Sequence, residues 1–201
     1  MLELFLTITI AIYLVELAAE ILNLRAMSPE VPASFRDVFD NEKYSQMQSY
    51  QAEITRFGIF QSGLTLVVFL IFWLTGGFAR IDAWSREPGF GPVGTGLLFF
   101  GALSLLRGSL ELPFSAWHTF VIEERFGFNR TTWKTFALDR IKGALIGAVI
   151  GGAIGAMVLS FFEHAGAEAW LYAWTAVSAI QLLLVFVAPV WIMPLFNRYE
   201  P

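Results

Sequence analysis

The sequence contains no cysteine, and only 15% of its 201 residues are charged. Without cysteine it can form no disulfide, thiolate nucleophile or thiolate metal ligand. Cations are also scarce, because the chain has 13 Lys and Arg residues and 17 Asp and Glu residues. The resulting net charge of −4 excludes a nucleic-acid binder that relies on a basic surface. Apolar residues make up 56% of the chain, and its mean hydropathy is +0.61. Soluble domains are about 45–50% apolar and about 25% charged, so these values predict an integral membrane protein.

Histidine is nearly absent as well, with His118 and His164 as its two occurrences. They lie far apart in the sequence and no His-Glu-x-x-His helix is present, so neither belongs to a recognisable zinc site. His118 is interpreted as an interfacial hydrogen-bonding residue. The chain also lacks a Gly-x-Ser-x-Gly elbow and a phosphate-binding glycine loop. Residue chemistry alone therefore shows no complete active site.

Long charge-free runs predict an all-α membrane domain over residues 1–201 with about five transmembrane helices. About 20 apolar residues, at 1.5 Å of rise each, cross a hydrocarbon core of roughly 30 Å. The first span, residues 4–24, is not free of charge, since it carries Glu16 and Glu20, and it is interpreted as an uncleaved span. Several glycines and Pro92 lie at the start of the third span, so its helix is expected to begin near Val93. The expected spans are residues 4–24, 57–79, 93–118, 143–162 and 169–193.

The cations between these spans predict the orientation in the membrane. Ten of them fall on one side, in the segments 25–56 and 125–142 and at Arg198, whereas Arg80 and Arg86 are the two on the other side. By the positive-inside rule, the N-terminus is expected outside and the C-terminus in the cytoplasm. The bacterial inner membrane and the endoplasmic reticulum both fit this arrangement.

The first cytoplasmic loop is expected to be partly helical. Pro29 and Pro32 oppose a helix around them, whereas Asp40 or Asn41 can cap a helix that begins at Glu42. That helix is expected to run without a break into the second span.

A glycine recurs at every fourth position of the fourth span, and such a stripe lets a neighbouring helix approach closely. Packing within the monomer is favoured here over dimerisation. The stripe consists of Gly143, Gly147, Gly151 and Gly155.

Charged residues within the spans are functional hypotheses, because burying a charge in a membrane is costly. Arg107 and Glu111 stand four apart on one helix face, two residues before the helix-kinking Pro113. They form either a neutralising ion pair that packs helices or the polar wall of a water-filled cavity. Glu16 and Glu20 have the same spacing, and such a like-charge pair suggests a hydrated interior or a cationic partner such as Arg107.

Residues 111–142 combine a kinked helix end, alternating charges and several aromatic residues. The segment includes the pair Glu123 and Glu124, the turn 126–129 that ends in Asn129, and Asp139 with Lys142 before the next span. A loop that only reverses the chain does not need this composition. We therefore expect a folded cytoplasmic element that docks on another part of the protein or on a partner.

Several stretches resemble the N-terminal membrane region of CAAX prenyl protease 1 homologues, which are Ste24-type zinc metalloproteases of the M48 family. The most specific are LPFS at 112–115 and TFVIEERFGFN at 119–129. Further similarity lies at Phe136 and in DRIK at 139–142, PLFNRY at 194–199, VP at 31–32, DVF at 37–39 and KY at 43–44.

The resemblance implies a helical membrane chamber that admits a peptide to a zinc site. In that family the zinc ligands lie in a His-Glu-x-x-His helix and a later glutamate, both beyond the segment that corresponds to residues 198–201. A catalytic zinc domain is therefore expected C-terminal to residue 201, and this chain, with no catalytic or metal-binding residue of its own, should be inactive alone. The chamber-lining or docking candidates are Arg107, Glu111, Glu123, Glu124, Asn129, Asp139 and Lys142.

The leading hypothesis is thus the membrane portion of a zinc endopeptidase that cleaves membrane-associated or prenylated substrates. Its expected partners are membrane lipid, a peptide or prenylated protein, and the catalytic domain of the same full-length chain, with no nucleic acid. A non-catalytic membrane scaffold or partner-binding module is the alternative. A small transporter is a third possibility, motivated by the intramembrane charges.

Overall fold

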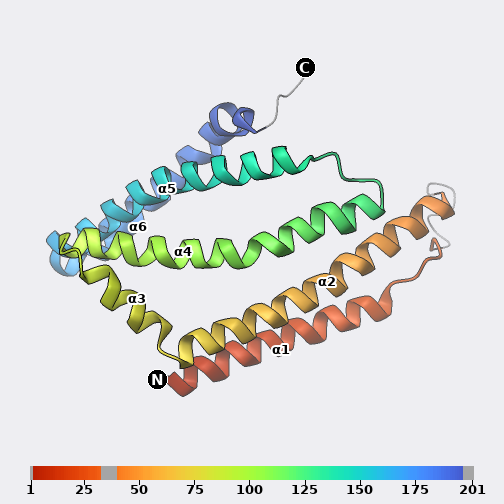
Figure 1. Cartoon of the computed structure of the whole chain (residues 1–201), viewed down its shortest axis with the longest axis horizontal. Helices are drawn as coiled ribbons and strands as arrows, with labels where there is room; N and C mark the ends of the chain where they lie inside the picture. The colour runs from red at the N-terminus through yellow and green to blue at the C-terminus, as the bar shows by residue number, and fades with distance from the viewer. Residues whose placement is uncertain (1, 33–39, 197–201) are drawn as a thin grey trace. The chain divides into compact units, whose positions relative to one another are not determined.

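The computed structural model describes residues 2–32 and 40–196, and these form helices, turns and short irregular segments (Figure 1). Five of its helical segments are long and apolar enough to cross a membrane: Glu3–Ala26, Asn41–Leu74, Gly91–Glu123, Trp133–His164 and Gly166–Leu195. The prediction of an all-α membrane domain with five spans is therefore confirmed. The predicted cytoplasmic cations Arg36 and Arg198, and the motif residues at 37–39 and 197–199, lie outside the described residues.

The chain divides into two compact units, of which the first comprises Met1–Thr75 and Ser109–Arg130. It contains α1 (Leu2–Ala26), α2 (Asn41–Leu74), the end of α4 (Gly91–Trp117) and the π-helix η2 (His118–Glu123). Helices α1 and α2 lie side by side and antiparallel (Figure 1). Their contact includes the rings of Phe5 and Trp73, whose centroids are 6.2 Å apart.

Helix α2 begins at Asn41, one residue before the predicted Glu42, and Asp40 is its N-cap. The Asp40 carboxylate accepts hydrogen bonds from the backbone N–H groups of Glu42 (2.8 Å) and Lys43 (3.3 Å), which is an N-cap. The helix then continues for 34 residues without a break. That is about 51 Å at 1.5 Å per residue, so it is longer than a hydrocarbon core is thick.

The predicted extent of the second span, 57–79, is wrong at its C-terminal end. Helix α2 ends at Leu74, where the Thr75 backbone N–H and hydroxyl both bond to the Ile71 carbonyl. Gly76 follows with a φ of 77°, a left-handed conformation that favours glycine and ends the helix. The next residues form a separate helix, α3 (Gly77–Arg86), which the hydropathy pattern did not predict.

The second unit comprises Gly76–Gly108 and Thr131–Pro201. Besides α3 and the first part of α4, it contains α5 (Trp133–His164), the 3₁₀ turn η3 (Gly166–Glu168) and α6 (Ala169–Val187). The described chain ends in the π-helix η4 (Ala188–Ile192) and the 3₁₀ turn η5 (Met193–Leu195). Helices α5 and α6 pack against each other across the tight turn at η3 (Figure 1). Helix α4 begins at Gly91 rather than near Val93.

Among the described residues, the glycine stripe of α5 closely approaches another helix only at its Gly155 end. A Cβ built on Gly155 would lie 3.2 Å from a methyl carbon of Leu97 on α4, which is a close helix–helix approach. A Cβ on Gly143, Gly147 or Gly151 meets no atom of the described chain within 4 Å. Packing within the monomer therefore holds at Gly155, and for the rest of the stripe it stays a prediction.

Candidate functional site

The predicted segment after η2 is folded, and it docks on α2. The Arg125 guanidinium lies 2.7 Å from a carboxylate oxygen of Glu53 on α2. Beside this ion pair, the Tyr50 ring meets Phe126 and Phe128 edge-on, with centroid distances of 5.2 and 4.8 Å. The docking element that the sequence predicts therefore packs on the first part of α2, in the same unit.

Hydrogen bonds within the loop set its shape. The backbone N–H groups of Phe128 and Asn129 both donate to the Glu123 carbonyl, at 2.8 and 3.2 Å. The Asn129 side-chain amide donates to the Glu124 carboxylate at 2.9 Å. Gly127 between them has a φ of 73°, a left-handed conformation that a side chain would strain. Three of the predicted candidates, Glu123, Glu124 and Asn129, are thus brought together in one turn.

The π-helix η2 joins α4 to this turn and carries His118. The ring nitrogen Nδ1 of His118 lies 3.5 Å from a Glu123 carboxylate oxygen, and both side chains are about one-third exposed. Ile122 is the buried anchor of η2, with 1% of its surface exposed. Single π-helical turns inside longer helices occur often at functional sites.

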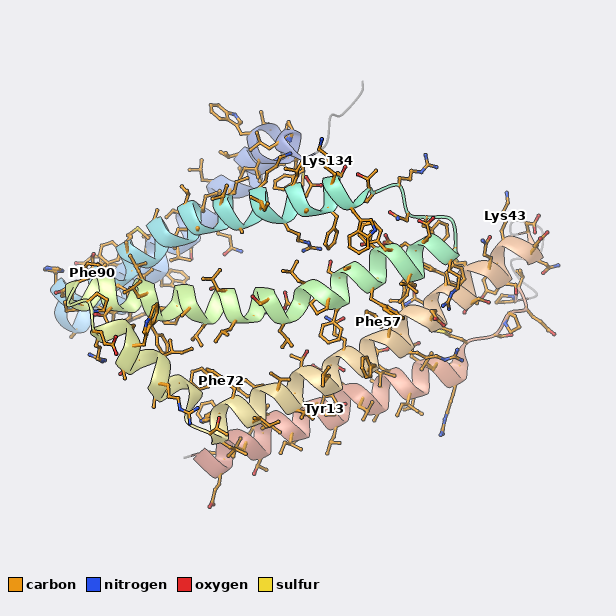
Figure 2. All side chains as sticks on the ribbon, in the orientation of Figure 1. Tyr13, Lys43, Phe57, Phe72, Phe90 and Lys134 are labelled. Carbon is orange, nitrogen blue, oxygen red and sulfur yellow. The ribbon has the colours of Figure 1, made fainter. Side chains whose placement is uncertain are left out.

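An open groove, here called the aromatic groove, lies between α2 and the α4–η2 segment of the first unit, with a volume of about 500 Å³. The Phe114 ring lies 6.1 Å from Phe57 and 6.4 Å from Phe60, centroid to centroid. Figure 2 shows Phe57 projecting from α2. The residues that line the groove are Glu53, Arg56, Phe57, Phe60, Pro113, Phe114, Trp117 and Ile122.

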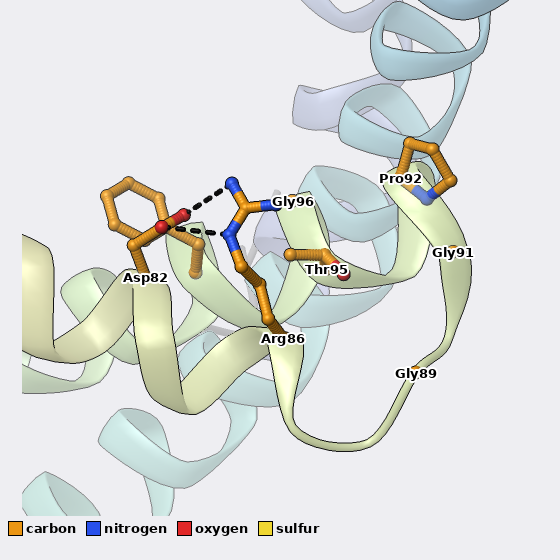
Figure 3. A pocket seen from close by; sticks show the side chains of 8 residues that line it. Asp82, Arg86, Gly89, Gly91, Pro92, Thr95 and Gly96 are labelled. Carbon is orange, nitrogen blue, oxygen red and sulfur yellow. Dashed lines mark hydrogen bonds and ion pairs between the residues drawn. The ribbon is translucent and has the colours of Figure 1, made fainter.

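A second open cavity of about 570 Å³ lies in the second unit, between α3 and the start of α4. There the Arg86 guanidinium makes two hydrogen bonds of 2.9 Å to the Asp82 carboxylate (Figure 3). These bonds lower the pKa of the Asp82 carboxyl and raise the pKa of Arg86. The pair was not predicted because α3 was not predicted, although Asp82 and Arg86 have the spacing of a helical ion pair. Gly89, Gly91, Pro92, Thr95, Gly96 and Phe99 complete the lining.

Lys142 links the beginning of α5 to the end of the last helix. Its ammonium donates a hydrogen bond of 3.0 Å to the Leu195 carbonyl and lies 5.9 Å from the centroid of the Phe196 ring. The Asp139 carboxylate is 3.7 Å away on the same helix. Two of the stretches that carry the family resemblance, at 139–142 and 194–199, are therefore in contact through the Lys142 side chain.

The remaining candidates, Arg107 and Glu111, lie four positions apart on α4, and both are exposed. The boundary between the two units passes between them, at residues 108 and 109. Whether they line a cavity stays a prediction, as does the suggested partnership of Glu16 and Glu20 with Arg107.

The described residues do not fit a zinc centre. Within 2–32 and 40–196, no three or more His, Cys, Asp or Glu side chains are grouped as metal ligands would be. His118 faces a single carboxylate, and the His164 ring nitrogen lies 2.9 Å from the Ser160 carbonyl. Both imidazoles are therefore interpreted as hydrogen-bonding groups rather than metal ligands.

The chain matches a known protein family over residues 20–198, described as "CAAX prenyl protease N-terminal, five membrane helices". It is 29% identical to CAAX prenyl protease 1 of Saccharomyces cerevisiae, covering 86% of this chain and 40% of that protein. It is 27% identical to the CAAX prenyl protease 1 homolog of Oryza sativa, covering 100% of this chain and 49% of that protein.

The structure is similar to the crystal structure of Ste24p from S. mikatae, with a TM-score of 0.87 and 28% identity. The similarity covers 98% of this chain and 47% of Ste24p. The chain thus spans less than half the length of these three relatives.

Proposed function

Because the chain belongs to the CAAX prenyl protease family, as its N-terminal membrane domain, we propose that it forms the wall of a membrane chamber in a zinc endopeptidase. The proposed substrates are prenylated or other membrane-associated peptides. The observation that carries the proposal is the match to Ste24p, which extends over nearly the whole chain at a TM-score of 0.87.

The zinc site and the general base are proposed to lie in sequence C-terminal to this domain in the full-length protein. The relatives support this division, since the chain covers 47% of Ste24p and 40% of the yeast protease. Zinc, when bound there, supplies an activated water for peptide hydrolysis. The residues of this chain would position the substrate and the catalytic domain and would not take part in bond cleavage.

The candidate residues divide into two proposed roles. Arg107 and Glu111 lie within the span Gly91–Glu123 and are proposed to line the chamber. The turn that contains Glu123, Glu124 and Asn129 is held on α2, and Lys142 with Asp139 holds the end of the last helix. These two contacts are proposed to fix the cytoplasmic edge of the wall, with the N-terminus outside and the C-terminus in the cytoplasm.

Zinc-dependent cleavage by the full-length protein tests the enzymatic part of the proposal. We expect the protein, reconstituted in lipid vesicles, to cleave a farnesylated peptide, to lose activity on treatment with a chelator and to regain it with zinc. A protein that shows no hydrolysis of prenylated or membrane-associated peptides, with or without zinc, would instead support the non-catalytic scaffold.

Photo-crosslinking tests the chamber part separately. A photoreactive amino acid at position 111 is expected to crosslink to a substrate peptide, and unlabelled substrate should compete. Position 149 provides the control, because Val149 is 72% exposed in the middle of the span Trp133–His164 and is not a chamber candidate. Equal crosslinking at the two positions would contradict a chamber-lining role for Glu111.

A further inference from the structure

We propose that the aromatic groove of the first unit binds an anionic phospholipid. The lipid phosphate would lie against the Arg56 guanidinium, and one acyl chain would lie along the rings of Phe57, Phe60 and Phe114. Three properties of the groove support this assignment: its depth in the membrane, its shape and the charge at its mouth.

The groove lies at headgroup level along α2. Arg56 is the last charged residue of this helix, and residues 57–74 after it are free of charge. These 18 residues extend about 27 Å, close to the thickness of a hydrocarbon core of roughly 30 Å. Arg56 therefore lies at the level of the lipid phosphates, and Phe57 and Phe60 lie within the first turn of α2 below that level.

The shape and lining of the groove suit an acyl chain. Its floor is closed by Ile122 and Phe114, which are 1% and 8% exposed, whereas Phe60 and Trp117 on its rim are 61% and 54% exposed. The volume of about 500 Å³ is in the usual range of ligand sites, about 300–1,000 Å³. An indole such as that of Trp117 is typical of the membrane interface, so the groove leads from headgroup level into the hydrocarbon region.

The mouth of the groove carries two charged residues, Glu53 and Arg56. The Glu53 carboxylate is neutralised by Arg125 at 2.7 Å. Arg56 is exposed, and in the described part of the chain it has no ion-pair partner. The mouth therefore has a net positive charge, and guanidinium groups bind phosphate through charge-assisted hydrogen bonds.

These observations favour an anionic lipid over a zwitterionic one. Anionic lipids concentrate in the cytoplasmic leaflet, where they are attracted to cationic residues next to membrane spans. This preference rests on the proposed function, which places the first part of α2 in the cytoplasm. Lipid binding can be measured without peptide cleavage, so the two proposals can fail separately.

Native mass spectrometry of the full-length protein in detergent tests the site. Phosphatidylglycerol and phosphatidylcholine with identical acyl chains are titrated against the protein. We expect tighter binding of phosphatidylglycerol, and Arg56→Gln should weaken it about five- to tenfold. Phosphatidylcholine should lose less, because its choline already offsets the charge of the phosphate that Arg56 contacts. The matched control is Arg25→Gln, which removes an exposed cation of the same unit from α1, outside the groove.

A second pair of variants tests the acyl-chain part. Phe60→Ala should weaken binding of both lipids, whereas Ile71→Ala, an exposed apolar residue of α2 outside the groove, should not. A cooperative thermal unfolding transition in each variant checks that the variant is folded. Equal binding of the two lipids, equal losses in Arg56→Gln and Arg25→Gln, or displacement of the lipid by one equivalent of farnesylated peptide would each overturn the proposal.

Discussion

Lys142 at the start of α5 donates a hydrogen bond of 3.0 Å to the Leu195 carbonyl at the end of the last helix. The two residues are 53 positions apart, and the carbonyl belongs to the turn η5, where helix ends leave carbonyl groups without intrahelical partners. A single side chain thereby joins the start of α5 to the end of the last described helix. In the proposed function this contact determines how the following sequence approaches the chamber wall.

Replacing Lys142 with methionine should loosen the end of the last helix. We expect Lys142→Met to lower the free energy of unfolding by about 1 kcal/mol, since it removes a hydrogen bond from a partly exposed charged donor. Lys142→Arg, which keeps the charge and the donor, should recover part of the loss. Denaturant unfolding in detergent measures both, and equal stability of Lys142→Met and the parent protein would contradict a tethering role.

The ion pair between Glu53 and Arg125 should by itself contribute little to the stability of the folded protein. Its side chains are 32% and 57% exposed, so solvent screens the attraction. In a double-mutant cycle with Glu53→Gln and Arg125→Gln, we expect a coupling energy of about 0.5 kcal/mol. A coupling energy of several kcal/mol would show that the pair, rather than the aromatic contacts of Tyr50, holds the loop on α2.

The Asp82–Arg86 pair predicts a pH dependence confined to α3. Because the pKa of Asp82 is lowered in the folded state, the pair stabilises α3 at pH values above the ordinary aspartate pKa. That contribution is lost as the pH falls through the lowered pKa. Carbon NMR titration of the Asp82 carboxyl should show this low value, and Arg86→Gln should raise it. An unchanged titration in the variant would contradict the pairing.

Two substitutions on the α5 glycine stripe should differ sharply in how much they destabilise the protein. Gly155→Leu places a side chain against Leu97 and should destabilise the protein by about 1–3 kcal/mol through overpacking. Gly151→Leu is the matched control, because a Cβ there meets nothing within 4 Å of the described chain. Thermal unfolding in detergent distinguishes the two. Equal losses would show that the stripe packs along its whole length.

Much of the fold could be predicted from residues with strong local preferences. The run of apolar residues after Arg56 predicts a span, and Asp40 before Asn41 predicts the N-cap that starts α2. Helix α3 was missed because Gly76 breaks an apolar run that hydropathy alone joins to α2. The turn at Gly76 depends on backbone conformation, which a hydropathy average does not contain.

The candidate site was predicted only in part. The composition of residues 111–142 indicated a docking element, but the sequence could not show that its partner is Tyr50 and Glu53 on α2, because those contacts are long-range. The bond from Lys142 to Leu195 is likewise invisible in any local pattern. The aromatic groove was not predicted, because α2 and α4 each contribute only part of its lining.

The proposed function depends on a zinc site whose ligands lie in the sequence that follows this membrane domain. The zinc content of the purified full-length protein, determined by elemental mass spectrometry, tests that dependence without any assumption about the substrate. We expect about one zinc per molecule, consistent with a single mononuclear site. A full-length protein that is folded, retains its five spans and binds no zinc after incubation with the metal would contradict the proposal.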